Sequence, residues 1–158
     1  MINKAGIDER LLEQNQRLLQ HLNTSCLNER QINQLLSEIF GYQVDSTTKI
    51  LLPFYSDYGR NIRLGNNTFI SCNVTMADRG GIQIGSNVEI GPGSTLLTVD
   101  GDQIGPIKIE SNVKIGGNVM ILPNVHIGAD VTIGAGAIIT HNIPKGRTIM
   151  RSEEEGII

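Results

Sequence analysis

The sequence predicts an all-β solenoid: a parallel β-helix of six-residue repeats with a short α-helical cap at its N-terminal end. The first observation is an aliphatic residue that returns every six positions: Ile109, Ile115, Ile121, Ile127, Ile133 and Ile139. The second is a smaller or branched apolar residue four positions after each of these: Val113, Val119, Val125, Val131, Ala137 and Ile143. Neither a helical period of 3.6 nor a strand period of 2 explains this pattern, and a fixed longer period is typical of solenoids.

The composition is the third observation. The chain has 158 residues, enough for one domain, but only 4% are aromatic, none is Trp, and 18 are Gly. The core must therefore be packed by Ile, Val and Gly rather than by large rings. A β-sandwich with many glycine turns is the alternative, and it is disfavoured because the six leading aliphatics stay in phase.

Each repeat is expected to supply one short strand and one corner, so that three repeats make a turn of about 18 residues. Successive turns then stack at the strand spacing of roughly 4.8 Å, and the leading aliphatics form columns inside. The pairs Asn66-Asn67, Ser86-Asn87 and Ser111-Asn112 are expected at corners, where the backbone needs positive φ.

The phase of the repeat slips twice. Ile82 continues the earlier register but Ile84 begins a new one, which predicts an irregular corner at 78–81. A second slip before Ile109 predicts a small loop that leaves the coil at 99–106. Binding and catalytic residues are usually added to a solenoid at such loops.

The N-terminal segment is predicted to form two amphipathic helices that cover the open end of the coil. The first spans residues 7–23, with an apolar stripe of Leu11, Leu12, Leu18, Leu19 and Leu22. The second begins after Asn28, which can form a capping box with Gln31, and ends at Gly41. We therefore expect a helical cap at 1–43, the β-helix at 44–149 and an acidic tail at 150–158.

Residues just before the leading aliphatics should point outward and stack one turn apart. Met120 and Ile138 then share one outer face, and Lys108 and His126 share another. An apolar column on the outside of a coil indicates a contact with another subunit. Two isolated surface hydrophobics are the alternative.

Charge and composition argue against several classes of partner. The net charge is −3 with acids and bases scattered, which predicts no nucleic-acid binding, and no apolar run reaches membrane length. Cys26 and Cys72 do not suggest a disulfide framework, and with no leader-like start the expected compartment is the cytoplasm. The three histidines lack the spacing of a zinc site, so no metal is expected.

Several motifs together resemble the galactoside/maltose O-acetyltransferase family of hexapeptide-repeat acyltransferases. They are found over most of the chain, at 53–59 and 61–65, Asn73–Asp78, 106–109, 133–136, 139–140 and 143–144. The resemblance implies a left-handed coil, a homotrimer, acetyl-CoA in the cleft between neighbouring coils, and a sugar hydroxyl as acceptor.

The resemblance also implies a catalytic histidine on the mid-coil loop, because imidazole titrates near neutrality and can take the hydroxyl proton. Here Gly101 stands at that position, and the loop is short. Asp100 and Asp102 flank it, but carboxylates of ordinary pKa near 4 are much weaker bases at neutral pH. His126, on an outward-facing strand position, is another candidate base.

Other family positions are partly retained. The resemblance assigns Asp57, Ser71 and Asp78 to acceptor binding, with Arg79 at a place that is often acidic. It assigns four residues to the CoA side: Gly117, Ala135, Thr140 and His141. The family's closing Gly-x-Pro motif is absent, and the chain instead continues from Met150 into three glutamates at 153–155.

Two functions therefore stand side by side. One is an acetyl-CoA-dependent O-acetyltransferase acting on a sugar or similar hydroxyl, supported by Asp57, Ala135 and Thr140. The other is a catalytically silent trimeric binding or scaffold relative, supported by Gly101 and the shortened loop.

Overall fold

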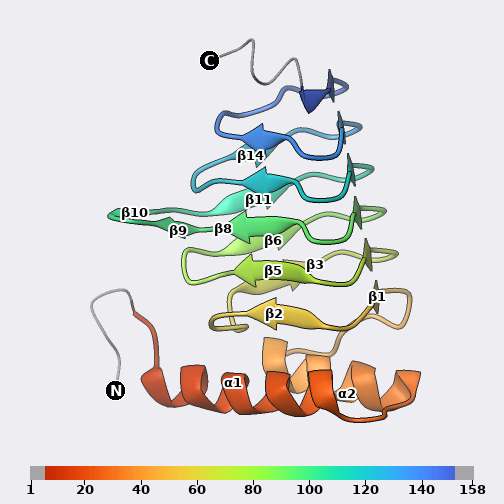
Figure 1. Cartoon of the computed structure of the whole chain (residues 1–158), viewed down its shortest axis with the longest axis vertical. Helices are drawn as coiled ribbons and strands as arrows, with labels where there is room; N and C mark the ends of the chain where they lie inside the picture. Colours follow the sequence, from red (N-terminus) through yellow and green to blue (C-terminus); the bar gives the residue numbers. More distant parts are fainter. Residues whose placement is uncertain (1–5, 152–158) are drawn as a thin grey trace.

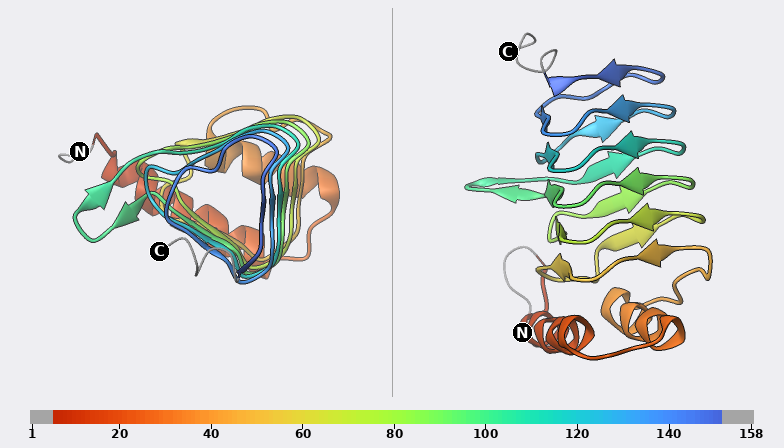
Figure 2. Two further views of the ribbon diagram at one scale, coloured as in Figure 1. Left: turned by 90° about the horizontal axis from the view of Figure 1, so that it is seen from above. Right: turned by 45° about the vertical axis from the view of Figure 1, so that its right-hand side comes forward.

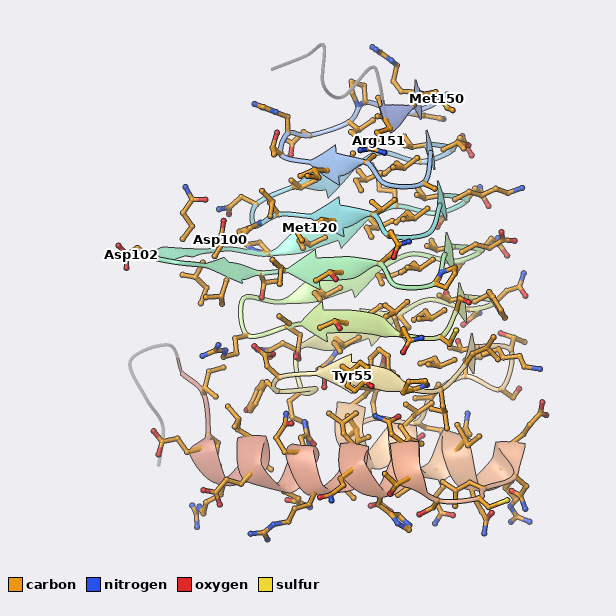
Figure 3. The ribbon with its side chains drawn as sticks, in the orientation of Figure 1. Tyr55, Asp100, Asp102, Met120, Met150 and Arg151 are labelled. Carbon is orange, nitrogen blue, oxygen red and sulfur yellow. The ribbon has the colours of Figure 1, made fainter. Side chains whose placement is uncertain are left out.

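The computed structural model describes residues 6–151 and shows a three-sided coil of parallel strands above two helices (Figure 1). It is a left-handed parallel β-helix with an N-terminal helical cap, which confirms the predicted fold class. The helices lie at one end of the coil, and Arg151 lies at the other (Figure 3). The tail glutamates at 153–155 lie outside the described residues.

Three parallel sheets form the sides of the coil, and the chain visits them in the order sheet 1, sheet 2, sheet 3 in every turn. Sheet 1 contains β1 (Lys49–Ile50), β4 (Phe69–Ile70), β7 (Glu89–Ile90), β12 (Lys114–Ile115), β15 (Thr132–Ile133) and β17 (Thr148–Ile149). Sheet 2 contains β2 (Phe54–Ser56), β5 (Val74–Ala77), β8 (Thr95–Leu97), β13 (Met120–Ile121) and β16 (Ile138–Ile139). Sheet 3 contains β3 (Ile62–Leu64), β6 (Ile82–Ile84), β11 (Ile107–Ile109) and β14 (His126–Ile127).

The corners of successive turns lie above one another and form three edges, which are visible when the coil is viewed from above (Figure 2). We call the edge between sheets 1 and 2 the 1–2 edge, and the edge between sheets 2 and 3 the 2–3 edge. Sheet 2 lies between these two edges, so they are the opposite borders of one face.

The interior contains the predicted aliphatic columns. Ile109 pairs with Ile127, Ile115 with Ile133, and Ile121 with Ile139, so each leading aliphatic lies directly over its equivalent in the next turn. All six are at most 3% exposed, and the second apolar position of each repeat is buried as well. Each strand of the three sheets except β2, which contributes Phe54, adds one or two aliphatic side chains to this core, which explains how the chain folds with so few aromatics.

The corners have the backbone conformation that the sequence predicts. Asn67, Asn87 and Asn112 have φ of 55°, 58° and 62°, in the left-handed region where Asn is favoured over most residues. Stacked asparagines also contact each other, since the amide of Asn67 donates to Asn87 Oδ1 at 2.7 Å.

Both predicted irregularities are present on the 2–3 edge. The corner at 78–81 closes with a hydrogen bond from the Gly81 amide to the Asp78 carbonyl. One turn further, the segment at 99–106 leaves the coil as a hairpin of β9 (Val99–Asp100) and β10 (Gln103–Ile104). The hairpin projects well beyond the side of the coil (Figure 2).

The cap consists of α1 (Glu9–Thr24) and α2 (Glu29–Phe40). The predicted capping box is present, since Asn28 Oδ1 accepts from the Gln31 amide at 2.9 Å and Gln31 Oε1 accepts from the Asn28 amide at 3.0 Å. Gly41 follows α2 with φ of 80°, the left-handed conformation that ends many helices.

The helices pack directly on the first turn. The ring of Phe40 meets Phe54 edge-on with centroids 6.0 Å apart, and the Asn23 side chain exchanges two hydrogen bonds with the Phe54 backbone. Gly59 approaches α1 so closely that an added Cβ would lie 2.3 Å from Asn15 Nδ2. Cap and coil therefore share one core, and none of the helices within residues 6–151 is long and apolar enough to span a bilayer.

The outer face of sheet 2 differs from the other two faces. Its central column contains no charge and runs through paired residues from turn to turn: Tyr55, Thr75, Thr95, Met120 and Ile138. Ile138 is 52% exposed and Tyr55 is 45% exposed. The outer columns of sheets 1 and 3 contain charged residues: Lys49, Glu89, Lys114, Arg63 and Lys108.

The stacked columns predict a large penalty for removing one member. Ile121→Ala should lower the free energy of unfolding by about 2–5 kcal/mol, because the side chain is fully buried between Leu96 and Ile139. Thr132→Ala, at an exposed position of β15, is the control and should change it by less than about 0.5 kcal/mol. Chemical unfolding followed by circular dichroism measures both, and equal small effects would contradict the stacked core.

Candidate active site

The predicted site residues other than His126, which lies on β14 of sheet 3, are found on the two opposite edges of sheet 2. Asp57, Asp78 and the hairpin tip lie on the 2–3 edge, as do Thr140 and His141 two turns beyond the hairpin. Ser71, Gly117 and Ala135 follow strands of sheet 1 and lie on the 1–2 edge. Within one chain the face of sheet 2 separates the two sets, so the structure does not bring all the predicted residues together.

Asp57 and Asp78 are brought together by the stacking of the first two turns. Asp57 Oδ1 accepts a hydrogen bond from the Asp78 amide at 2.8 Å, and its Oδ2 accepts from Arg79 Nε at 2.8 Å. The Asp57 side chain is 25% exposed and that of Arg79 is 42% exposed. An ion pair therefore faces solvent at this corner.

Asp78 is fully buried and binds backbone groups. Its Oδ1 accepts from the amides of Tyr58 and Gly59 at 3.1 and 2.8 Å, and its Oδ2 accepts from the Asn61 amide at 3.0 Å. These bonds fix the corner that presents Asp57, so Asp78 stabilises this corner and does not contact solvent. Burial is the main cause that raises the pKa of Asp78 to about 6, and the neighbouring Asp57 adds to it.

Thr98 holds the base of the hairpin by hydrogen bonds. It is not among the site residues predicted from the sequence. The Thr98 hydroxyl accepts from the Gly80 amide at 2.8 Å and donates to the Ala77 carbonyl, while its carbonyl accepts from the Gly105 amide at 2.9 Å. The signal available in the sequence is a Thr directly before a break in the repeat. The structure shows that this Thr is buried. The hairpin therefore leaves the coil from a fixed base.

Gly101 lies at the tip of the hairpin, between Asp100 and Asp102. Its φ is 59°, and an added Cβ would have no neighbour within 4 Å. Figure 3 shows Asp102 at the outer tip of the hairpin and Asp100 nearer the coil. Within residues 6–151, neither the Asp100 nor the Asp102 carboxylate forms a hydrogen bond with another group on the 2–3 edge.

The two remaining candidate histidines already have partners. His126 Nε2 lies 2.9 Å from Glu110 Oε2 on the outer face of sheet 3, and both side chains are more than 40% exposed. His141 Nδ1 lies 2.7 Å from the Thr140 hydroxyl. Neither histidine lies on the hairpin, so the position predicted for the base has no imidazole in this chain.

The 1–2 edge is lined by small residues. Gly117 lies against Pro92, and Gly116 packs so closely below Ala135 that an added Cβ would lie 2.7 Å from its amide nitrogen. Arg151 lies beside Gly136 at the far end of this edge (Figure 3). This edge is therefore formed by small residues, with the Arg151 side chain near one end. Among residues 6–151 no group of three or more His, Cys, Asp or Glu side chains is placed to hold a metal.

A separate cavity of about 660 Å³ lies between α2 and the first coil turn. Ile32 and Leu36 from the helix and Ile50 from β1 line it, and the pair Lys49–Glu29 at 3.2 Å connects β1 to α2. None of the predicted site residues lies there.

Comparisons with known proteins indicate the family of the chain. A family model described as bacterial transferase hexapeptide (six repeats) matches residues 106–141. The galactoside O-acetyltransferase of Escherichia coli is 35% identical over 135 residues, which cover 78% of this chain and 65% of that protein. A putative acetyltransferase of Schizosaccharomyces pombe is 39% identical over 122 residues, which cover 70% of this chain and 59% of that protein. The chain therefore spans less than two thirds of the length of these two curated relatives.

A solved acetyltransferase structure matches a larger share of this chain. A hexapeptide-repeat acetyltransferase from Vibrio cholerae, complexed with acetyl coenzyme A, has a TM-score of 0.84 and 34% identity. The match covers 90% of this chain and 82% of that one.

The buried carboxyl of Asp78 predicts a specific pH dependence. Because folding raises its pKa, the folded state holds the proton where the unfolded chain has lost it. The stability from this group is therefore present below about pH 4 and is lost as the pH rises through about 6.

Asp78→Asn removes this titration but places an amide opposite the backbone donors. It should therefore destabilise the protein at every pH, and by more at pH 5 than at pH 7.5. Thermal unfolding of both proteins at the two pH values measures the difference. A penalty that is larger at pH 7.5 would show that Asp78 is ionised and stabilising in the folded protein.

Proposed function

We propose, because this chain belongs to the hexapeptide-repeat acetyltransferase family, that it binds acetyl-CoA and transfers the acetyl group to the hydroxyl of a sugar or similar acceptor. The observation that supports this most is the match over 90% of the chain to a relative whose structure contains acetyl coenzyme A. In the reaction the acceptor oxygen bonds to the acetyl carbonyl carbon and the carbon–sulfur bond breaks. The hydroxyl proton leaves to a base and the CoA sulfur ends as a thiol.

We propose further that the active unit is a homotrimer with the site between neighbouring copies. Two observations on this chain support it. The central column of the sheet 2 face is uncharged and includes the exposed Met120 and Ile138, as expected of a covered surface. The predicted acceptor residues are divided between the two opposite borders of that face, and so are the predicted CoA residues, so only a second copy can bring one border against the other.

The 1–2 edge suits the CoA side of such a cleft. Gly117 and Ala135 leave backbone exposed along a narrow border where a long ligand can lie close to the chain. Thr140 and His141 would then approach from the 2–3 edge of the neighbouring copy. Arg151 is the cation nearest the far end of the 1–2 edge and would lie near the phosphates of CoA.

A silent binding or scaffold protein is the second candidate, and the hairpin favours it. Gly101 supplies no base, and the imidazoles of His126 and His141 are bound to Glu110 and Thr140. An acceptor hydroxyl would then depend on Asp100, Asp102 or solvent for proton removal. This candidate retains acetyl-CoA binding and the trimer but has no transfer rate above the uncatalysed reaction.

Ligand binding and assembly should be lost together. Wild-type protein should bind acetyl-CoA in a calorimetric titration and have the mass of a trimer in light scattering. Ile138→Glu places a charge on the sheet 2 face and should abolish both, because the cleft needs two copies. Thr132→Glu, on the outer face of sheet 1, is the control. Binding by a monomeric Ile138→Glu variant would overturn the site between copies, and no wild-type binding at millimolar ligand would overturn both functions.

Gly101→His tests the missing base. Histidine tolerates positive φ better than most residues, and the position has open space, so the fold should accept it. The thiol release rate with a hydroxyl acceptor should rise by at least about 10-fold, since general-base catalysis contributes about 10²–10⁴-fold. Gly101→Asn adopts the same backbone without a base and should leave the rate unchanged. Equal rates in both variants would favour the silent relative.

A further inference from the structure

We propose that the acceptor has an anionic group, a carboxylate or a phosphate, which binds to the guanidinium of Arg79. This inference rests on the proposed function, because it names the class of molecule that the 2–3 edge binds. It adds a specificity-determining residue, Arg79, to the acceptor residues that the resemblance assigns.

The first support is that Asp57 is not available as a free carboxylate. One oxygen accepts from the Asp78 amide and the other from Arg79 Nε, both at 2.8 Å. The ion pair compensates its charge, and both oxygens are already engaged. A neutral sugar could donate a hydroxyl only to the remaining lone pairs of these oxygens, whose charge the arginine already compensates.

The second support is that Asp78 cannot take the place of Asp57. It is 0% exposed, and three backbone amides occupy its oxygens. The corner therefore offers no carboxylate whose charge is unpaired and exposed, although two aspartates are present.

The third support is the guanidinium itself. Its Nε is held by Asp57, which fixes the plane of the group, and Asp57 is its only hydrogen-bond partner within residues 6–151. With the side chain 42% exposed, the two Nη groups remain as donors toward solvent. An oriented pair of guanidinium donors matches the two oxygens of a carboxylate or phosphate.

Within residues 6–151, Arg79 forms an ion pair with Asp57 and with no other acid. Asp100 and Asp102 lie on the hairpin, with Asp102 at its outer tip (Figure 3). Asp78 is buried behind the corner, and the charge of Asp57 is compensated by the same arginine. What the corner presents to solvent is thus an ion pair without net charge, in which the Nη groups of Arg79 are the donors left for a ligand.

The experiment compares acceptors that differ only in the anionic group. Methyl glucoside is paired with methyl glucuronide, and glucose with glucose 6-phosphate, in assays of thiol release from acetyl-CoA. The same compounds are titrated calorimetrically, with CoA present, into wild type, Arg79→Gln and Arg79→Lys. Arg30→Gln removes the same charge from α2 and is the matched control.

The anionic member of at least one pair should have the higher kcat/KM and bind more tightly. Arg79→Gln should lower its kcat/KM and affinity by about 10- to 100-fold, as expected for a charge-assisted contact. The neutral member should be little affected, Arg79→Lys should restore part of the effect, and Arg30→Gln should match wild type. The pair that responds distinguishes a carboxylate from a phosphate.

Two results would overturn the inference while leaving the proposed function intact. One is transfer to neutral acceptors with equal or greater efficiency, and the other is an unchanged anion preference in Arg79→Gln. If acetyl-CoA binds but no acceptor is acetylated, the calorimetric titrations still decide. Loss of anion binding in Arg79→Gln supports the inference. Anion binding that is unaltered in Arg79→Gln, or undetectable in wild type, rejects it. Failure to bind acetyl-CoA rejects the proposed function instead.

Discussion

The structure depends on the vertical stacking of aliphatic side chains inside a coil whose strands are hydrogen-bonded to the turns above and below. Ile121, for example, lies between Leu96 and Ile139 and cannot shift sideways without leaving both. Every turn must therefore keep the same three short sides. Residues that do not pack in this core lie at the corners, on the hairpin or on outward-facing strand positions, and the candidate site is drawn from these places.

Features with a local or periodic cause could be predicted from the sequence. The hexad positions such as Ile115 follow from a repeat that only stacking explains, and the Asn28–Gln31 capping box and the left-handed Gly41 follow from short-range chemistry. The hairpin was located from a slip in the repeat. These signals lie within a few residues of each other or recur at a fixed period.

The contacts within the candidate site could not be predicted in the same way. The Asp57–Arg79 ion pair and the three amides around Asp78 depend on how the first two turns are aligned at one corner. The resemblance placed Asp57 and Asp78 on the acceptor side, but it did not reveal that one is paired and the other buried. Nor did it show that Ser71 lies on the opposite border of sheet 2 from both.

The stacking also fixes the reach of any ligand that extends along the coil. The hairpin and Thr140 lie two turns apart on the same edge, so their separation along the axis is a whole number of strand spacings, about 4.8 Å each. Evolution can lengthen or shorten that span only by inserting or deleting complete turns. Adjustments smaller than one strand spacing must come from side chains alone. The coil can therefore match the length of a bound ligand only in steps of one complete turn.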